Sequence, residues 1–432
     1  MVGMRFEAAE LLTSGQCPLN CAYCYIPKVP IMQGVHSDIV KHLEDGTFLD
    51  NVEKICGTNL THLGFWGTEP ALTLGILQTK LDDIEKKFPK AKNIGFSTSM
   101  VMPEPIIEFA NHLKGRGMKF DLQVSIDGPE FIIDKNRFPG ASKRIPENVI
   151  KFVDAMQGTD INVQLHWKPT LTIDNMREMA VNPDLIDEYM NFFRELEEEI
   201  VARNKNSQIN LWRGGYTPTI AVPGKYTSED GRDFADYLKK LHEKGYVSAY
   251  TGRLSRLPTF SDELGPKRKM FTCSGGDTNV GVGDNLHICH RTFYLNDDRY
   301  VETVLQKEDI NNWDISIFNQ GMVDIMRKYY MPKVDDEMGL QNFDYILRGY
   351  HDFWQFNVAQ TEVMVKELAL AGQADKLFLK DKGYLSLFAL FMQTAHSCPM
   401  ESILNTGSLH LTPISLIRMF ANGAFREIIK TI

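Results

Sequence analysis

Cys17-Pro18-Leu19-Asn20-Cys21-Ala22-Tyr23-Cys24 is a short stretch in which three cysteines are separated by three residues and then by two. It follows an apolar segment, Ala8 to Thr13, that predicts a first β-strand. Thiolates are the usual ligands of iron–sulfur clusters, and close spacing brings three of them to one cube. A four-iron cube with three protein ligands keeps one iron open to a substrate or cofactor. The stretch therefore predicts a 4Fe–4S cluster held by Cys17, Cys21 and Cys24.

A zinc knuckle or a set of free thiols would use the same three cysteines. A zinc site needs a fourth Cys or His close by, and the nearest histidine, His36, lies twelve residues after Cys24. Disulfides are disfavoured because the chain has seven cysteines, an odd number, and we expect no export signal before them. The cluster is favoured over both alternatives because further motifs follow along the chain.

The composition is that of an ordinary globular protein. The 432 residues suffice for one large α/β domain with an appended unit, and 43% of them are apolar and 24% charged. The longest apolar run, Leu385 to Met392, is too short to span a bilayer. A net charge of −9 gives no support for duplex nucleic acid as a partner. We therefore expect a cytoplasmic protein with no membrane or nucleic-acid partner, since an oxygen-labile cluster and free thiols fit a reducing compartment.

Strands and helices alternate along the first half of the chain. Predicted strands cover residues 8–13, 61–65, 93–97, 119–125, 161–166 and 208–212, and predicted helices cover 37–54, 72–87, 103–117, 146–156 and 183–204. Such alternation predicts parallel strands joined by right-handed crossovers. Functional-looking residues at the ends of the six strands predict an α/β fold of the partial (β/α)6 TIM type.

Two short motifs end the second and third predicted strands. Gly67-Thr68-Glu69-Pro70 predicts a tight turn, from which Pro70 directs the chain toward a helix. Ser97-Thr98-Ser99 offers small hydroxyl groups that can bind a ribose or a carboxylate, or cap the following helix.

Two further strand ends carry charged or polar residues. Ser125-Ile126-Asp127-Gly128-Pro129 ends the fourth predicted strand, with Asp134 and Arg137 a short distance downstream. His166 and Lys168 close the fifth, and a barrel would direct both toward its interior. A histidine at a strand end is also commonly a structural residue.

A compact cysteine-bearing unit follows the predicted barrel. Cys273 precedes a segment that predicts a hairpin with a Gly283-Asp284-Asn285 turn, and Cys289-His290-Arg291 follows it. Of the remaining chain only Cys398 adds a further cysteine. We predict a barrel in residues 1–225, a linker helix region in 226–265, the hairpin unit in 266–308 and a helical region in 309–432.

The C-x3-C-x2-C spacing, with Tyr23 before its last cysteine, resembles the radical S-adenosylmethionine (SAM) superfamily. In that family the open iron binds SAM, and the electron of the cluster cleaves SAM to a 5′-deoxyadenosyl radical. Gly67 to Pro70 resembles the Gly-Gly-Glu-Pro element that contacts the SAM amino group, with Thr68 in place of the second glycine. The cofactor-binding residues that the resemblance implies are Tyr23, Gly67, Thr68, Glu69, Pro70, Ser97, Ser99, Ser125, Asp127 and Arg137.

The S-x-D-G-P…D-x-x-R stretch and the hairpin unit resemble the SPASM/Twitch-type subfamily, which includes anaerobic sulfatase maturases and maturases of ribosomal peptides. There an arginine pairs with the SAM carboxylate; Arg137 and Arg144 both lie in the right region, and we assign the role to Arg137. The hairpin cysteines of the subfamily bind an auxiliary 4Fe–4S cluster. The remaining SPASM cysteine block, C-x2-C-x5-C-x3-C, is missing from this sequence.

The resemblance therefore implies one auxiliary 4Fe–4S cluster, held by Cys273, Cys289 and Cys398. Its fourth ligand would be a histidine, a substrate or a solvent molecule. His290, His166 and Lys168 are the candidate catalytic residues. Some maturases carry an acidic base where His290 stands, and a histidine can also take a proton at neutral pH.

The expected function is radical modification of a peptide or protein side chain, with electrons from a reductant such as flavodoxin or ferredoxin. The first predicted strand begins close to Met1, so we expect no leader-binding domain before it. One alternative is a radical SAM enzyme whose small metabolite binds at the open auxiliary cluster. A second is a non-catalytic iron–sulfur scaffold.

Overall fold

The computed structural model describes residues 7–24, 31–212, 219–221, 279–282 and 286–287, together with residues 233, 236, 237, 240, 241, 243, 244 and 246. Cys273, Cys289, His290 and Cys398 lie outside the described residues, as does the predicted helical region 309–432. None of the described helices is both long enough and apolar enough to cross a membrane.

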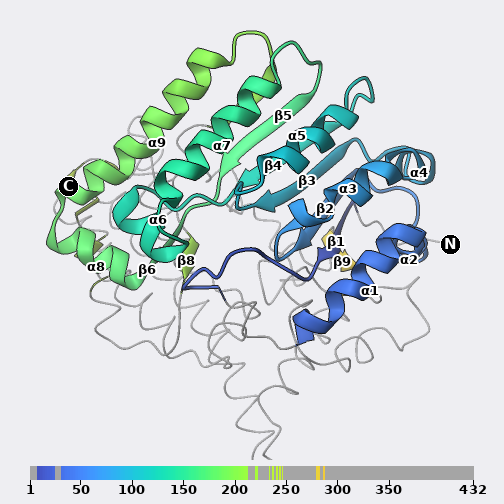
Figure 1. Ribbon diagram of the computed structural model, residues 1–432, viewed down its shortest axis with the longest axis horizontal. Coiled ribbons are helices and arrows are strands. Elements are labelled where there is room, and N and C mark those ends of the chain that lie inside the picture. The colour runs from blue at the N-terminus through green and yellow to red at the C-terminus, as the bar shows by residue number, and fades with distance from the viewer. Residues whose placement is uncertain are drawn as a thin grey trace, which may run out of the picture. The chain divides into compact units, whose positions relative to one another are not determined.

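A mostly parallel sheet of eight strands organises the described chain, in the order β10-β9-β1-β2-β3-β4-β5-β7 (Figure 1). Its strands are β1 (Ala8–Ser14), β2 (His62–Gly67), β3 (Asn93–Thr98), β4 (Lys119–Val124), β5 (Asn162–Trp167), β7 (Gln208–Leu211), β9 (Asn279–Val282) and β10 (Leu286–His287). The first six pair in parallel and in chain order. The predicted α/β class with six parallel strands is confirmed, and this order is consistent with a partial TIM-type barrel.

The last two strands extend the sheet beyond its first strand. β9 pairs in parallel with β1, with Ala8 opposite Asn279, and β10 returns antiparallel to β9. These pairings agree with the hairpin that the sequence predicts around residues 283–285. The hairpin thus joins the sheet at the strand that leads into the cysteine loop.

The helices begin and end differently from the sequence prediction. They are α1 (Ile31–Asp45), α2 (Thr47–Cys56), α3 (Leu74–Leu77), α4 (Leu81–Lys87), α5 (Pro103–His112), α6 (Glu130–Asn136), α7 (Ala141–Ala155), α8 (Ile173–Val181) and α9 (Asp184–Arg203), with short 3-10 turns η2 (Pro70–Leu72) and η3 (Gln78–Lys80). The single helix predicted over 37–54 is two helices, because Gly46 adopts a left-handed conformation (φ 82°) between them. The helix predicted over 72–87 is likewise divided into short segments.

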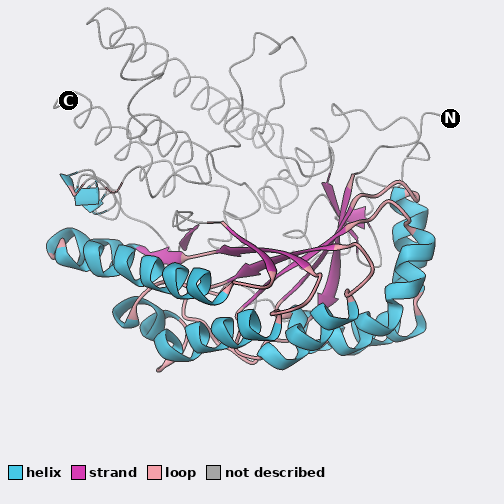
Figure 2. Cartoon of the chain, turned by 90° about the horizontal axis from the view of Figure 1, so that it is seen from above, coloured by secondary structure: helices cyan, strands magenta, loops and turns pink. Residues whose placement is uncertain are grey.

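One face of the sheet packs against helices and is apolar. α3, α5 and α7 lie over β2 to β5, and Figure 2 shows these helices on one side of the sheet. Phe109 of α5 lies at the centre of this layer, with its ring centroid 6.0 Å from that of Phe65 and 5.9 Å from that of Phe120. All three side chains are fully buried. Strand alternation therefore places the core between the sheet and these helices.

The opposite face of the sheet carries polar side chains and two glycines. Glu10, Gly64, Gly95 and Asp121 lie side by side across β1 to β4 in the strand register. A Cβ atom on Gly95 would lie 2.9 Å from the Cβ of Asp121. The glycine therefore leaves the space that the Asp121 side chain needs.

The chain divides into two compact units, the second of which holds residues 171–188 among those described. Within it, Thr172 and Asn175 form a capping box at the start of α8, with the Thr172 N–H donating to Asn175 Oδ1 at 2.9 Å. Arg177 on the same helix forms an ion pair with Asp233 at 2.6 Å. A small separate sheet pairs β6 (Thr170–Thr172) with β8 (Thr219–Ala221).

Replacing Phe109 with alanine should lower the free energy of unfolding by about 3–5 kcal/mol. The substitution removes a buried ring that packs against Phe65 of β2 and Phe120 of β4, and it leaves a cavity. Urea unfolding followed by circular dichroism measures this change. The partly buried Phe192 on α9 is the matched control, and Phe192→Ala should cost clearly less. Equal losses for the two variants would contradict the assignment of Phe109 to the centre of the core.

Candidate functional site

The motifs within the described residues meet at one edge of the sheet. The cysteine loop and the strand-end motifs follow the carboxyl ends of neighbouring parallel strands, and such ends share one edge. The N–H of Thr68 donates to the Ser14 carbonyl at 3.1 Å, joining the exits of β1 and β2. The hydroxyl oxygens of Ser97 and Ser125 lie 3.4 Å apart, joining the exits of β3 and β4.

Gly67 has to be glycine because the two chain segments approach closely. Its φ is 140°, and a Cβ atom there would lie 2.2 Å from the backbone oxygen of Ser14. Thr68 has an ordinary negative φ, since Met100 is the one non-glycine residue with positive φ in the described chain. The Thr68 hydroxyl instead donates to the carbonyl of Gln16, at the start of the cysteine loop. Threonine therefore fits this position and adds a contact to the loop.

Glu69 has its carboxylate turned into the protein. The residue is 1% exposed, and its oxygens accept hydrogen bonds from the Thr98 hydroxyl at 2.7 Å and from the Ser99 N–H and hydroxyl at 2.9 and 2.5 Å. The Ala71 N–H also donates to this carboxylate. Glu69 thus fixes the turn after β2 against the Ser97–Ser99 turn after β3.

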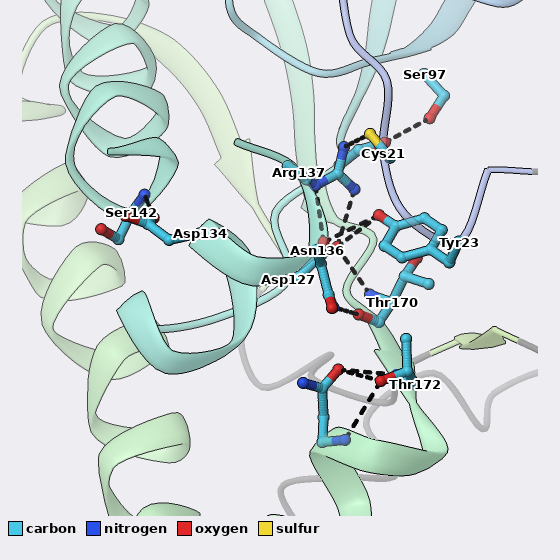
Figure 3. A network of polar contacts seen from close by, with 12 residues as sticks. Cys21, Tyr23, Ser97, Asp127, Asp134, Asn136, Arg137, Ser142, Thr170 and Thr172 are labelled. Atoms are coloured by element: carbon cyan, nitrogen blue, oxygen red, sulfur yellow. Dashed lines mark hydrogen bonds and ion pairs between the residues drawn. The ribbon is translucent and has the colours of Figure 1, made fainter. Parts of the chain in front are cut away.

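Asp127 is the centre of a buried polar network (Figure 3). Its side chain is 0% exposed, and it accepts hydrogen bonds from the Tyr23 hydroxyl at 2.9 Å and from the Thr170 N–H at 3.1 Å. Arg137 donates from Nε and Nη2, each at 2.8 Å, in a two-pronged ion pair. This one carboxylate joins the cysteine loop, the turn after β4, the end of α6 and the start of β6.

Arg137 faces Cys21 with the nitrogen that Asp127 does not use. Nη1 lies 4.0 Å from Cys21 Sγ, and the guanidinium carbon lies 5.6 Å from the centroid of the Tyr23 ring. Burial disfavours the charged form, but the charge of Asp127 and its hydrogen bonds outweigh this, so the pKa of Arg137 is raised. Arg137 is therefore a permanent positive charge beside the cysteine loop.

The cysteine loop fits a thiolate-bound cluster. The backbone N–H of Leu19 donates to Cys17 Sγ at 3.5 Å, and Arg137 supplies the second N–H···S contact, to Cys21. Burial raises the pKa of the Cys21 thiol to about 11, so this free thiol is protonated at neutral pH. Iron binding would displace its proton.

No three His, Cys, Asp or Glu side chains of the described residues are grouped to hold a single metal ion. A cube does not need such a group, because each sulfur binds a different iron.

His166 and Lys168 lie near this edge of the sheet, with partners that the sequence did not predict. His166 Nε2 lies 3.0 Å from Asp121 Oδ1, and Lys168 Nζ lies 5.5 Å from the centroid of the Trp66 ring. Burial raises the pKa of Asp121, but the hydrogen bond and charge of His166 outweigh it, and the pKa is lowered. The sequence could have indicated Asp121 through the alternation of buried and partly exposed residues along β4. This alternation places Asp121 on the same face of the sheet as His166.

No protein-family model matches the sequence, and no curated protein matches it. Similar solved structures include native anSMEcpe with bound AdoMet, at 17% identity and a TM-score of 0.34, and the same protein with bound AdoMet and the Cp18Cys peptide, at 17% identity and a TM-score of 0.32. These matches cover 55% of this chain and 60% and 59% of the other chains, which is less than two thirds of their length. Similarity of this size leaves the function to be inferred from the residues of this chain.

Replacing Asp127 with asparagine should lower the free energy of unfolding by about 3–5 kcal/mol, because it leaves the buried Arg137 charge without its partner. Urea unfolding of the full chain gives the value. Asp82→Asn is the matched control, since Asp82 pairs with Arg116 at 2.7 Å but its side chain is 85% exposed. The control should change stability far less, and similar losses in both variants would contradict the central role of Asp127.

Proposed function

We propose that the chain is a radical SAM enzyme whose Cys17, Cys21 and Cys24 hold a 4Fe–4S cluster. The observation that carries this proposal is the Asp127 network. It links the C-x3-C-x2-C loop, through Tyr23 and Arg137, to the motif after β4 that the cofactor would share. A loop of free thiols would not need a buried ion pair directed at one of its sulfurs.

The residues divide into those that would face the cofactor and those that hold them in place. Ser97 and Ser125 present neighbouring hydroxyls that suit a ribose or a carboxylate, and the turn at Gly67 and Thr68 is the proposed contact for the SAM amino group. Ser99 contacts Glu69 with both its N–H and its hydroxyl. Because their carboxylates are buried and bonded within the protein, Glu69 and Asp127 act by positioning the turns around the cofactor.

The cluster and SAM would supply the one-electron chemistry that removes a hydrogen atom from the substrate. Arg137 would hold a positive charge against Cys21, and Tyr23 would fix the loop through Asp127. His166, in contact with Asp121, and Lys168, over Trp66, are candidates for binding the substrate or accepting its proton.

We further propose that the substrate is a peptide or protein side chain and that one auxiliary 4Fe–4S cluster assists, bound by Cys273, Cys289 and Cys398. What supports this is the pairing of β9 with β10, because β9 follows Cys273 and β10 precedes Cys289 in the sequence. His290 would lie next to the cluster, as a base or a ligand. Flavodoxin or ferredoxin would serve as the reductant.

Replacing Cys21 with alanine should abolish 5′-deoxyadenosine formation when the anaerobically reconstituted protein is given dithionite and SAM, because the cluster loses one of its three ligands. Cys56→Ala is the matched control. Cys56 is a buried thiol on α2 that belongs to no motif, so its loss should leave SAM cleavage unchanged.

Cleavage that survives in Cys21→Ala would overturn the proposed cluster. A wild-type protein with a full complement of iron but no cleavage, with and without a panel of candidate peptides, would favour an iron–sulfur scaffold instead. Cleavage stimulated by a small metabolite and not by peptides would favour the small-molecule alternative.

Joint substitution of Cys273 and Cys289 by alanine should remove the iron of one cluster and leave the other. Iron and sulfide analysis of the reconstituted protein should fall from about eight to about four irons per chain, the content of two cubes and of one. The Cys56→Ala protein again serves as the control. About four irons in both the wild type and the double variant would rule out the auxiliary cluster.

A further inference from the structure

Arg137 contacts both Asp127 and Cys21 from one buried guanidinium. Its side chain is 6% exposed. Nε and Nη2 point to the two oxygens of Asp127, and Nη1 is the nitrogen that faces Cys21 Sγ, at 4.0 Å. A planar guanidinium fixes the directions of its N–H groups. The two-pronged pair with Asp127 therefore aims Nη1 at the sulfur, as Figure 3 shows.

The charge nearest to the Cys21 sulfur in this network is positive. Asp127 is held on the Nε and Nη2 side of the guanidinium, so the arginine stands between that carboxylate and Cys21. Although Asp127 and Arg137 carry no net charge together, the sulfur interacts more strongly with the nearer partner, because the Coulomb energy falls with distance. Burial of both side chains limits screening by water.

A hydrogen-bond donor and a positive charge beside a cluster sulfur favour the reduced cluster, which carries one more negative charge. We propose that Arg137 raises the reduction potential of the cluster by donating from Nη1 to Cys21, and that Asp127 is the residue that positions it. This inference rests on the proposed function, because it requires the cluster at Cys17, Cys21 and Cys24. This role at the cluster differs from the pairing with the SAM carboxylate that the family resemblance implies, because Nε and Nη2 of Arg137 already pair with Asp127.

The described loop offers a useful contrast at Cys17. Its sulfur accepts from the Leu19 backbone N–H at 3.5 Å, a donor that no side-chain substitution removes. The Arg137 contact can therefore be removed alone, while the Cys17 contact is retained in every variant.

The test is a redox titration of the reconstituted full chain followed by electron paramagnetic resonance. The signal to follow is the one whose shape changes when SAM is added, which separates this cluster from an auxiliary one. Arg137→Lys keeps the positive charge but loses the planar fork, and Asp127→Asn/Arg137→Gln replaces the ion pair with an uncharged pair. Both variants should lower the reduction potential of the cluster by about 59 mV. This shift equals a change of about tenfold in the equilibrium constant for one-electron reduction.

Asp127→Asn alone should shift the potential in the opposite direction. Asparagine keeps one oxygen that can accept from the guanidinium and hold Nη1 toward Cys21. Because the negative charge is removed and the positive charge stays beside Cys21, the cluster should become easier to reduce. A network that merely supports the loop would give shifts of the same sign in all three variants. That result would overturn the proposal. If Asp127→Asn does not fold, Arg137→Lys and the double variant still decide the question.

Arg144→Lys is the matched control. Arg144 Nη2 donates to the Val101 carbonyl at 3.3 Å, and the substitution should leave the potential unchanged. An equal shift of the potential in Arg144→Lys and Arg137→Lys would overturn the inference. An unchanged potential in Arg137 variants that bind as much iron as the wild type would also overturn it. Failure of the wild type to bind iron through Cys17, Cys21 and Cys24 would instead defeat the proposed function, so the two failures are distinguishable.

Discussion

The buried carboxylate of Asp127 is the constraint on which the rest of the site depends. Taking a carboxylate and a guanidinium out of water is unfavourable unless their hydrogen bonds are satisfied inside the protein. Here the Tyr23 hydroxyl, the Thr170 N–H and two nitrogens of Arg137 satisfy the carboxylate. Because these partners come from three different segments, the ion pair is stable only when the cysteine loop is in place. The cysteine loop therefore packs into place as the charges of Asp127 and Arg137 are buried.

The strands were predictable from the sequence, and the helix boundaries were less so. Runs such as Asn93–Thr98 combine apolar residues with small ones, and their alternation with helical segments specified a parallel sheet. The break at Gly46 was not evident, because a glycine inside a helical pattern can also continue the helix, and only its left-handed φ ends α1. The pairing of β9 with β1 joins segments too far apart in sequence for any local pattern to indicate.

At the site, the sequence identified the motifs but not the directions of their side chains. Glu69 and Asp127 stood in motifs associated with a cofactor, yet both carboxylates are bonded within the protein. Tyr23 and Asp127 are 104 residues apart, so their contact follows from tertiary structure. Asp121 was missed because a lone aspartate in a strand carries no motif. Alternation along β4 indicates which sheet face it occupies, but its contact with His166 at 3.0 Å follows from the tertiary structure.

The pairing of β9 with β1 also has a consequence for biosynthesis. β1 acquires its neighbour on that side only after about 270 further residues have been made. Until then one edge of β1 has unpaired backbone groups, and an open edge is a template for wrong partners. Domains with such long-range pairing fold slowly and expose intermediates to aggregation. Low growth temperature and chaperones should therefore improve the yield of soluble protein more than stronger expression.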